Sequence, residues 1–236
     1  METIAEVHLR ESINIWKKYA IPKKLNLVPL IIPEKGLPDC TLSDVDILFI
    51  GFNPSHSEGF IKKEFQKLPK LKNSSFTHDS LFEWSGEISE DQYSILKYYE
   101  EYAFRNYSFF QHFKDLSNSH NYAHLDPFIM RHTNQKVAKD LILKKGLALN
   151  EFGRAQLDLF IGTIKQIRPK IVVVCNALTS KILAKEFFQK NEISSSMDIW
   201  DDDIKIIYGS MVTGQRAMDL GSRARLKEQI SNLLNK

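Results

Sequence analysis

The chain of 236 residues is poor in cysteine, with only Cys40 and Cys175. Two cysteines exclude the disulfide framework of a small secreted domain, and they are too few for a four-cysteine zinc site or iron–sulfur cluster. Cys175 lies within an apolar run and is expected to be a small core residue. The histidines and carboxylates lack ligand-like spacing. We therefore expect neither a metal nor another cofactor.

Long apolar runs are also absent, so no membrane partner is expected. The first residues carry Glu2, Glu6, His8 and Arg10 where a signal peptide would need an apolar segment. A reducing cytoplasm is the expected location. The net charge of +3 is small, so it permits a polyanionic partner without requiring one.

Glycine-rich phosphate loops are missing as well. None of the predicted strand-to-helix turns carries GxGxxG or GxxxxGK[ST], which argues against a doubly wound protein that binds a small phosphorylated ligand. Nor is there a linker rich in glycine or serine, or a visible repeat. With 43% hydrophobic and 26% charged residues the composition is that of an ordinary globular protein, and residues 1–236 are expected to form one domain.

The elements that remain alternate between strands and helices. Strands are expected at 47–50, 121–130, 171–175 and 204–208, and the main helices at 4–19, 89–113, 150–167, 177–189 and 222–234. Such alternation is typical of an α/β fold, because each helix returns the chain to the start of the next parallel strand. We predict a three-layer α/β/α sandwich with a central, mostly parallel four-stranded sheet.

The first of these strands leads into the segment ILFIGFNPS, residues 47–55. An apolar run bounded by turn residues predicts a strand covered on both faces, and ligands of open α/β sheets bind at the carboxyl ends of such strands. Gly51 allows a close approach to the backbone, Pro54 stiffens the turn, and Asn53 presents an amide. The alternative is a purely structural turn, since asparagine tolerates turn geometry.

The segment ILFIGFNPS resembles the first motif of the uracil-DNA glycosylase superfamily, and it is closest to the mismatch-specific and single-strand-selective branches. RPKIVVVCNALTSKILA resembles a later strand and helix of that family, and the strand before YGSMVTGQ matches the place of its second motif. The order of elements agrees over most of the chain. The resemblance implies a domain that flips a base out of the DNA stack and hydrolyses its bond to deoxyribose.

The resemblance also assigns roles to residues of this sequence. Asn53 would hold the attacking water, Gly51, Phe52 and Pro54 would shape the pocket wall, Phe76 would lie beneath the flipped base, and Asp126 would read its edge. The loop from Ser210 would enter the duplex with Met211 as an apolar wedge. Gly214 and Gln215 of this loop would bind DNA, and Arg216 and Arg223 beyond it would contact phosphates, although a basic cluster at a helix start is often only solvated.

Two departures from the family pattern accompany these assignments. The second motif usually reads His-Pro-Ser or Asn-Pro-Ser, and here it reads Ser210-Met211-Val212. His78, His124 and His132 are candidates to replace the missing histidine. An ionised Asp126 would accept hydrogen bonds from an amino or imino group but repel the carbonyl of uracil. Alternatively, Asp126 pairs with Arg131 and supports the loop.

The function expected from the sequence is a monofunctional DNA glycosylase of base excision repair, acting as a monomer on single- or double-stranded DNA that contains a damaged or deaminated base. Asparagine cannot accept a proton from water, so turnover should be slow. The alternative is a weakly active or inactive member of the same fold that binds nucleic acid or a free base. Salt-sensitive binding without product would distinguish that alternative.

Overall fold

The computed structural model describes residues 2–186, 197–200, 203–212 and 217–235. Its centre is a five-stranded sheet with the order β4-β3-β5-β7-β6. Four strands run parallel, namely β4 (Tyr122–Leu125), β3 (Ile47–Ile50), β5 (Ile171–Val174) and β7 (Ile204–Tyr208). The fifth, β6 (Met197–Trp200), lies antiparallel to β7 at the edge. The prediction of a mostly parallel sheet is confirmed, but the sheet has one strand more than the four predicted.

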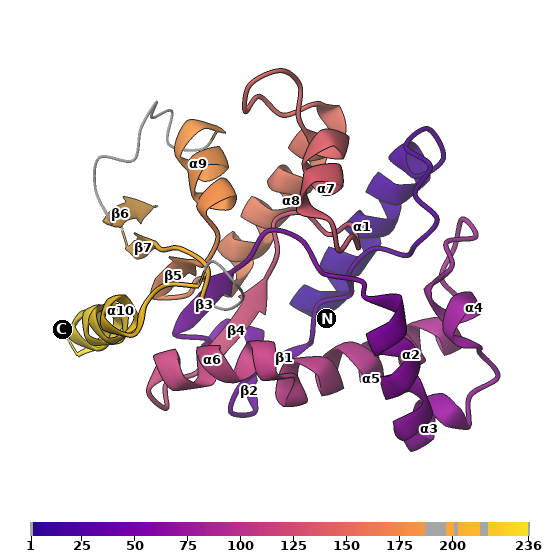
Figure 1. Cartoon of the computed structure of the whole chain (residues 1–236), viewed down its shortest axis with the longest axis horizontal. Coiled ribbons are helices and arrows are strands. Elements are labelled where there is room, and N and C mark those ends of the chain that lie inside the picture. The colour runs from indigo at the N-terminus through magenta and orange to yellow at the C-terminus, as the bar shows by residue number, and fades with distance from the viewer. Residues whose placement is uncertain (1, 187–196, 201–202, 213–216, 236) are drawn as a thin grey trace.

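The central strands β3 and β5 are buried on both sides, and their residues alternate between two cores. Leu48 and Ile50 of β3 belong to a core shared with α1 (Ile4–Tyr19) and α8 (Glu151–Ile167). Ile47 and Phe49 belong to a second core shared with α6 (Ser108–Ser117) and α10 (Leu220–Leu234). Figure 1 shows α8 and α9 (Ala177–Glu186) above the sheet and α6 and α10 below it. This arrangement is compatible with a three-layer α/β/α sandwich.

Helices α2 (Glu58–Lys67), α3 (Pro69–Lys72), α4 (His78–Phe82) and α5 (Glu90–Asn106) form what we call the helical annex. They lie to one side of the sheet in Figure 1. The annex has its own hydrophobic cluster, which includes Phe65, Leu71, Phe82 and Leu96. The chain therefore leaves the sheet after β3 and returns to it only at α6 and β4.

The predicted long helix at 89–113 is divided into α5 and α6. Ser89 caps α5 as expected, accepting a hydrogen bond from the Gln92 backbone N–H. Tyr107 has an extended backbone, with φ of −75° and ψ of 137°, and it separates the two helices. The break turns the phenylalanine-rich start of α6 toward the carboxyl ends of the strands, where it contributes to the site described below.

The remaining elements are short. A two-stranded hairpin of β1 (Lys35–Gly36) and β2 (Cys40–Thr41) precedes β3, and α7 (Gln135–Ile142) follows β4; the sequence indicated neither. The predicted strand at 121–130 ends at Leu125, and the segment after it forms a loop. Among the described residues, no helix is both long enough and apolar enough to cross a membrane.

Candidate functional site

A pocket of about 400 Å³ opens where the parallel strands end. Its volume is in the range of small-molecule sites, and its position is the one at which open α/β sheets bind ligands. The loops after β3, β4, β5 and β7 all contribute to it, as do α2, α5 and α6. The ends of these four strands therefore meet at one site in the part of the chain that the structure describes. Among the predicted site residues, those that line the pocket are Gly51, Phe52, Asn53, Pro54, Asp126 and Met211.

Asn53 is fixed in the pocket wall by three hydrogen bonds. Its Nδ2 donates to the backbone oxygens of Pro54 at 3.1 Å, Met130 at 3.2 Å and His132 at 2.8 Å. A carbonyl oxygen only accepts, so these partners determine which end of the amide is nitrogen. Oδ1 has no hydrogen-bond partner in the described part of the chain and remains available to accept one from a ligand or water. Asn53 thus joins the loop after β3 to the loop after β4.

Gly51 lies against the carboxyl group of Asp126. A Cβ atom at Gly51 would stand 2.2 Å from Asp126 Oδ1 and 3.2 Å from His124 Nε2. Real Cβ atoms do not approach an oxygen so closely, so only glycine fits here while Asp126 keeps its position. The backbone oxygen of Gly51 accepts a hydrogen bond of 2.7 Å from Thr179 Oγ1 of α9, which holds this turn from the other side.

Asp126 is buried without a hydrogen bond from any described residue. His124 Nε2 is 3.7 Å from Oδ1 of Asp126, too far for a hydrogen bond. Burial, with a smaller contribution from the charge of Glu100, raises the pKa of Asp126 to about 7. Near neutral pH much of the protein therefore carries Asp126 as a neutral acid, which can donate as well as accept.

His124 is enclosed by phenylalanine rings. Its ring stacks on that of Phe113, with centroids 5.3 Å apart and planes at 14°, and it meets the edges of Phe109 and Phe110. Burial lowers the pKa of His124 to about 3, so the imidazole is neutral. Its Nε2 is buried and has no hydrogen-bond partner among the residues that the structure describes. A neutral His124 beside a partly neutral Asp126 offers hydrogen-bonding atoms that the protein itself leaves unused.

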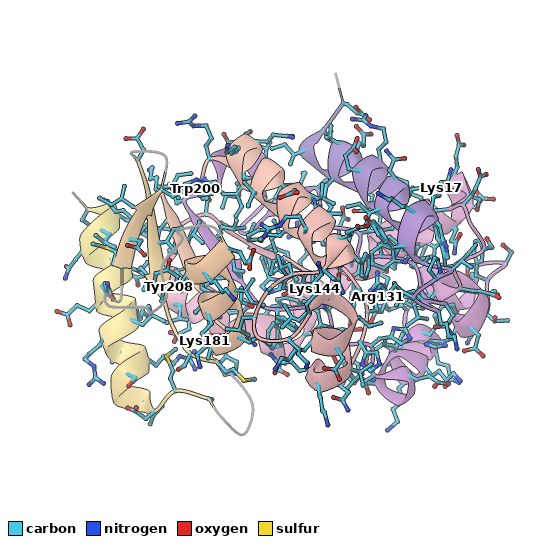
Figure 2. All side chains as sticks on the ribbon, turned by 90° about the horizontal axis from the view of Figure 1, so that it is seen from above. Lys17, Arg131, Lys144, Lys181, Trp200 and Tyr208 are labelled. Carbon is cyan, nitrogen blue, oxygen red and sulfur yellow. The ribbon has the colours of Figure 1, made fainter. Side chains whose placement is uncertain are left out.

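Arg131 does not pair with Asp126, so that alternative is wrong. Its Nη2 lies 2.5 Å from Oε1 of Glu100 in α5, and its guanidinium also donates to the backbone oxygens of Val28 and Pro29. Figure 2 shows Arg131 inside the molecule, whereas Lys17 lies at the periphery. Burial raises the pKa of Glu100, and Arg131 opposes that rise. Arg131 therefore connects the loop after β4 to the helical annex.

Several predicted site residues lie elsewhere. Phe76 packs against the hydrophobic cluster of the helical annex and does not line the pocket, because the chain has left the sheet at that point. Ser210 is exposed and outside the pocket lining. Arg223 of α10 is engaged by α6, with Nη1 2.7 Å from His112 Nδ1 and Nη2 2.9 Å from Asp115 Oδ2. Gly214, Gln215 and Arg216 lie outside the described residues.

The aromatic wall of the pocket is the feature that sequence reasoning missed. Phe109 is 42% exposed and lines the pocket with Phe110, Phe113 and Tyr107. Phe60 of α2 contacts Tyr107 edge to face at 4.9 Å and is also exposed. The run YSFFQHF directly after the helix break was the available signal. His124 and His132, but not His78, line the pocket.

No group of three or more His, Cys, Asp or Glu side chains suited to a metal ion occurs among the described residues. Comparison with known proteins gives no relative: no family model matches the chain, and no curated protein matches it. The resemblance of ILFIGFNPS to a glycosylase motif therefore stays a prediction.

Proposed function

We propose that the protein is a DNA glycosylase of the uracil-DNA glycosylase type, which flips a damaged or deaminated base into the pocket and hydrolyses its N-glycosidic bond. The observation that carries the proposal is the meeting of Asn53, Gly51 and the unpartnered Asp126 in one aromatic pocket at the strand ends. A flipped base needs a flat apolar surface and polar groups at its edge. Phe109, which is exposed and lines the pocket, would supply the surface, and Asp126 and His124 the edge.

In this proposal Asn53 holds the water through its free Oδ1, while its Nδ2 stays bound to the three carbonyl oxygens. The hydroxyl of the water joins C1′ of the deoxyribose, the electron pair of the C1′–N bond leaves with the base, and the base takes up a proton. Asn53 orients the water but cannot accept its proton, so the reaction should be slow. A donor at the departing base, such as neutral Asp126, would stabilise the charge that develops there.

The protonation of Asp126 bears on the class of base. As a neutral acid it would donate to a ring carbonyl, so uracil, hypoxanthine and xanthine no longer face a repelling carboxylate. As an anion it would favour an amino or imino group. The proposed substrate is therefore a base with a carbonyl at its edge, best bound at or below the pKa of Asp126.

Base release from oligonucleotides that contain uracil, hypoxanthine, xanthine or a thymine mismatch, followed by alkaline cleavage at the abasic site, tests the proposal. We expect the wild type to release at least one base and Asn53→Ala to lose about 100-fold in rate, the loss typical of removing a group that orients the reaction. Asn121→Ala is the matched control, because Asn121 precedes β4 at the opposite edge of the sheet and its Nδ2 binds Asp44 O. Equal rates for Asn53→Ala and wild type would contradict the assignment.

A second candidate is a protein of this fold that binds nucleic acid or a free base without turnover. Ser210, which stands at the place of the family's second motif, favours this candidate. Its side chain is exposed and does not line the pocket, so it supplies no catalytic group there. Salt-sensitive DNA binding by the wild type with no base release from any substrate of the panel would identify this candidate.

A further inference from the structure

A second cavity lies beside the pocket, separated from it by the loop after β4. This cavity, which we call the lysine groove, has a volume of about 420 Å³. Residues 23–27 after α1 form one side of it, and residues 130–134 with α7 form the other. Arg131, His132 and Thr133 line both the pocket and the groove. These three residues form a short wall between the two cavities. If one unit of a polymer occupies the pocket, the units next to it can therefore cross this wall into the groove.

The charge of the groove has one sign. Its described lining includes Lys23, Lys24 and Arg131 but neither aspartate nor glutamate. Arg131 is neutralised by Glu100, whereas neither lysine has an ion pair or hydrogen bond from its side chain within the described ranges. Lys24 is exposed and Lys23 half-buried. Two unneutralised ammonium groups beside a cavity favour a polyanion.

The groove is formed by a well-fixed backbone. Lys23 N–H donates to Tyr19 O at 3.1 Å, Lys24 N–H to Ile21 O at 3.0 Å, and Trp16 Nε1 to Leu27 O at 2.9 Å. Lys24 has a φ of 55°, in the left-handed region that residues other than glycine seldom adopt. The lysine side chains thus project from a turn that is in place before any ligand arrives.

The shared wall adds a neutral donor. The backbone N–H of Asn134 donates to His132 Nδ1 at 3.0 Å, so a neutral His132 carries its proton on Nε2. Val137, which is 40% exposed, and Leu25 and Leu141 give the groove an apolar side as well. A nucleotide chain matches this combination, because its phosphates need cations and donors while its sugars and bases offer apolar surface.

We infer that the lysine groove binds the sugar-phosphate backbone of the nucleic acid strand whose base enters the pocket, with Lys23 and Lys24 contacting its phosphates. This inference rests on the proposed function, since it makes pocket and groove two parts of one strand path. The strand crosses the wall formed by residues 131–133, the segment that Asn53 holds in place. An acidic peptide is the competing occupant, and the experiment distinguishes it.

The test is the salt dependence of binding of unmodified oligothymidylate, measured by fluorescence anisotropy. The test variant is Lys23→Gln/Lys24→Asn, because asparagine tolerates the positive φ at position 24. The matched control is Lys70→Gln/Lys72→Gln on α3, which borders neither cavity and removes the same charge. Equal melting temperatures of the three proteins would establish that all are folded.

The expected result follows from counterion release. Each phosphate contact to a single strand contributes about 0.7 to the slope of log K against log salt concentration, so the groove variant should lose about 1.4. From roughly 50 to 200 mM salt, wild-type affinity should then fall about seven-fold more than that of the variant. The control should keep the wild-type slope.

Four outcomes would overturn the inference. Equal slopes for wild type and groove variant, with base release retained, would refute the groove while leaving the proposed function intact. An equal loss in the Lys70/Lys72 control would attribute the effect to net charge alone. Displacement of oligothymidylate by a polyglutamate peptide of equal charge at equal concentration would assign the groove to an acidic protein. Failure of the wild type to bind oligothymidylate at all would refute the groove, whereas the proposed function is refuted only by absence of base release from every substrate of the panel.

Discussion

Two buried carboxyl groups line the same pocket, but the charged groups beside them differ. Glu100 on α5 is 9% exposed and Asp126 after β4 is 5% exposed. Glu100 has an arginine within 2.5 Å, whereas Asp126 has only a neutral histidine at 3.7 Å. Both have a raised pKa through burial, but only Glu100 has a cation that opposes the rise.

The difference separates a structural carboxyl group from one available to a ligand. Arg131 uses its guanidinium on Glu100 and two backbone oxygens, so this pair joins the helical annex to the sheet. Asp126 forms no such connection within the described residues, and a side chain at position 51 would collide with its carboxyl group. Buried polar groups without partners cost stability, and strongly shifted ones gather at functional sites. Asp126 is therefore the carboxyl group whose position folding alone does not explain.

Of the changes to these two carboxyl groups and their neighbours, removing the guanidinium of Arg131 should lower the free energy of unfolding most. Arg131→Met leaves Glu100 buried without its partner, and breaking a buried ion pair costs about 3–5 kcal/mol of unfolding free energy. The double variant Arg131→Met/Glu100→Gln should recover part of that loss, because no charge is then left unpaired. Urea denaturation measures both. A loss no greater than that of Arg10→Met, which breaks an exposed pair with Glu2, would mean that the buried pair does not hold the annex.

Asp126→Asn tests the environment of Asp126 through the pH dependence of the free energy of unfolding. The folded pKa of Asp126 is raised from 3.8 to about 7, so the folded protein binds this proton more tightly than the unfolded chain does. Its contribution is fully present below the unfolded pKa, declines as pH rises from about 4 to 7, and is lost above that. The upper limit for a shift of this size is on the order of 4 kcal/mol.

The asparagine variant has no such titration. It should therefore be more stable than the wild type at pH 8.5, and the advantage should shrink toward pH 5. Urea denaturation of both proteins across this range measures the difference, in which the titrations of His124 and other groups cancel. Parallel stability curves for the two proteins would show that Asp126 titrates normally in the folded state.

Gly51→Ala should have a smaller effect, about 1–3 kcal/mol of destabilisation, because its methyl group must displace the Asp126 carboxyl. Adding Asp126→Ala removes the clashing oxygen and should return part of the loss. Gly162→Ala in the interior of α8 is the control: nothing lies within 4 Å of its added Cβ, and it should stabilise by about 0.4–1 kcal/mol. Thermal denaturation of Gly51→Ala, Gly51→Ala/Asp126→Ala and Gly162→Ala would rank their stabilities. A Gly51→Ala protein as stable as Gly162→Ala would disprove the close contact.

Local signals were sufficient for much of the fold. Apolar runs located β3, β5 and β7, and Asn150 caps α8 by accepting from Gly153 N–H as expected. The break at Tyr107 was not predictable, since the aromatic periodicity continues through it and tertiary packing decides where the helix ends. Strand β6, with its mixed burial, pairs only at the sheet edge and carries no run of its own to indicate it.

The site was predictable where it follows a strand and unpredictable where it depends on long-range packing. Asn53 and Asp126 come directly after parallel strands, so their convergence followed from the topology. The partner of Arg131 lies 31 residues earlier on α5, and a sequence cannot show which acid a buried arginine reaches. The run YSFFQHF was visible in the sequence, but packing beyond the break at Tyr107 decides that its rings face the pocket.

The pH dependence of base release by wild type and Asp126→Asn, on the best substrate of the panel, tests the central claim most directly. If Asp126 reads a carbonyl as a neutral acid, the wild-type rate should fall about tenfold per pH unit above pH 7, in proportion to the protonated fraction. The Asp126→Asn rate should stay level, since its amide donates at every pH, and it should exceed the wild type at pH 9. Parallel profiles would contradict the account.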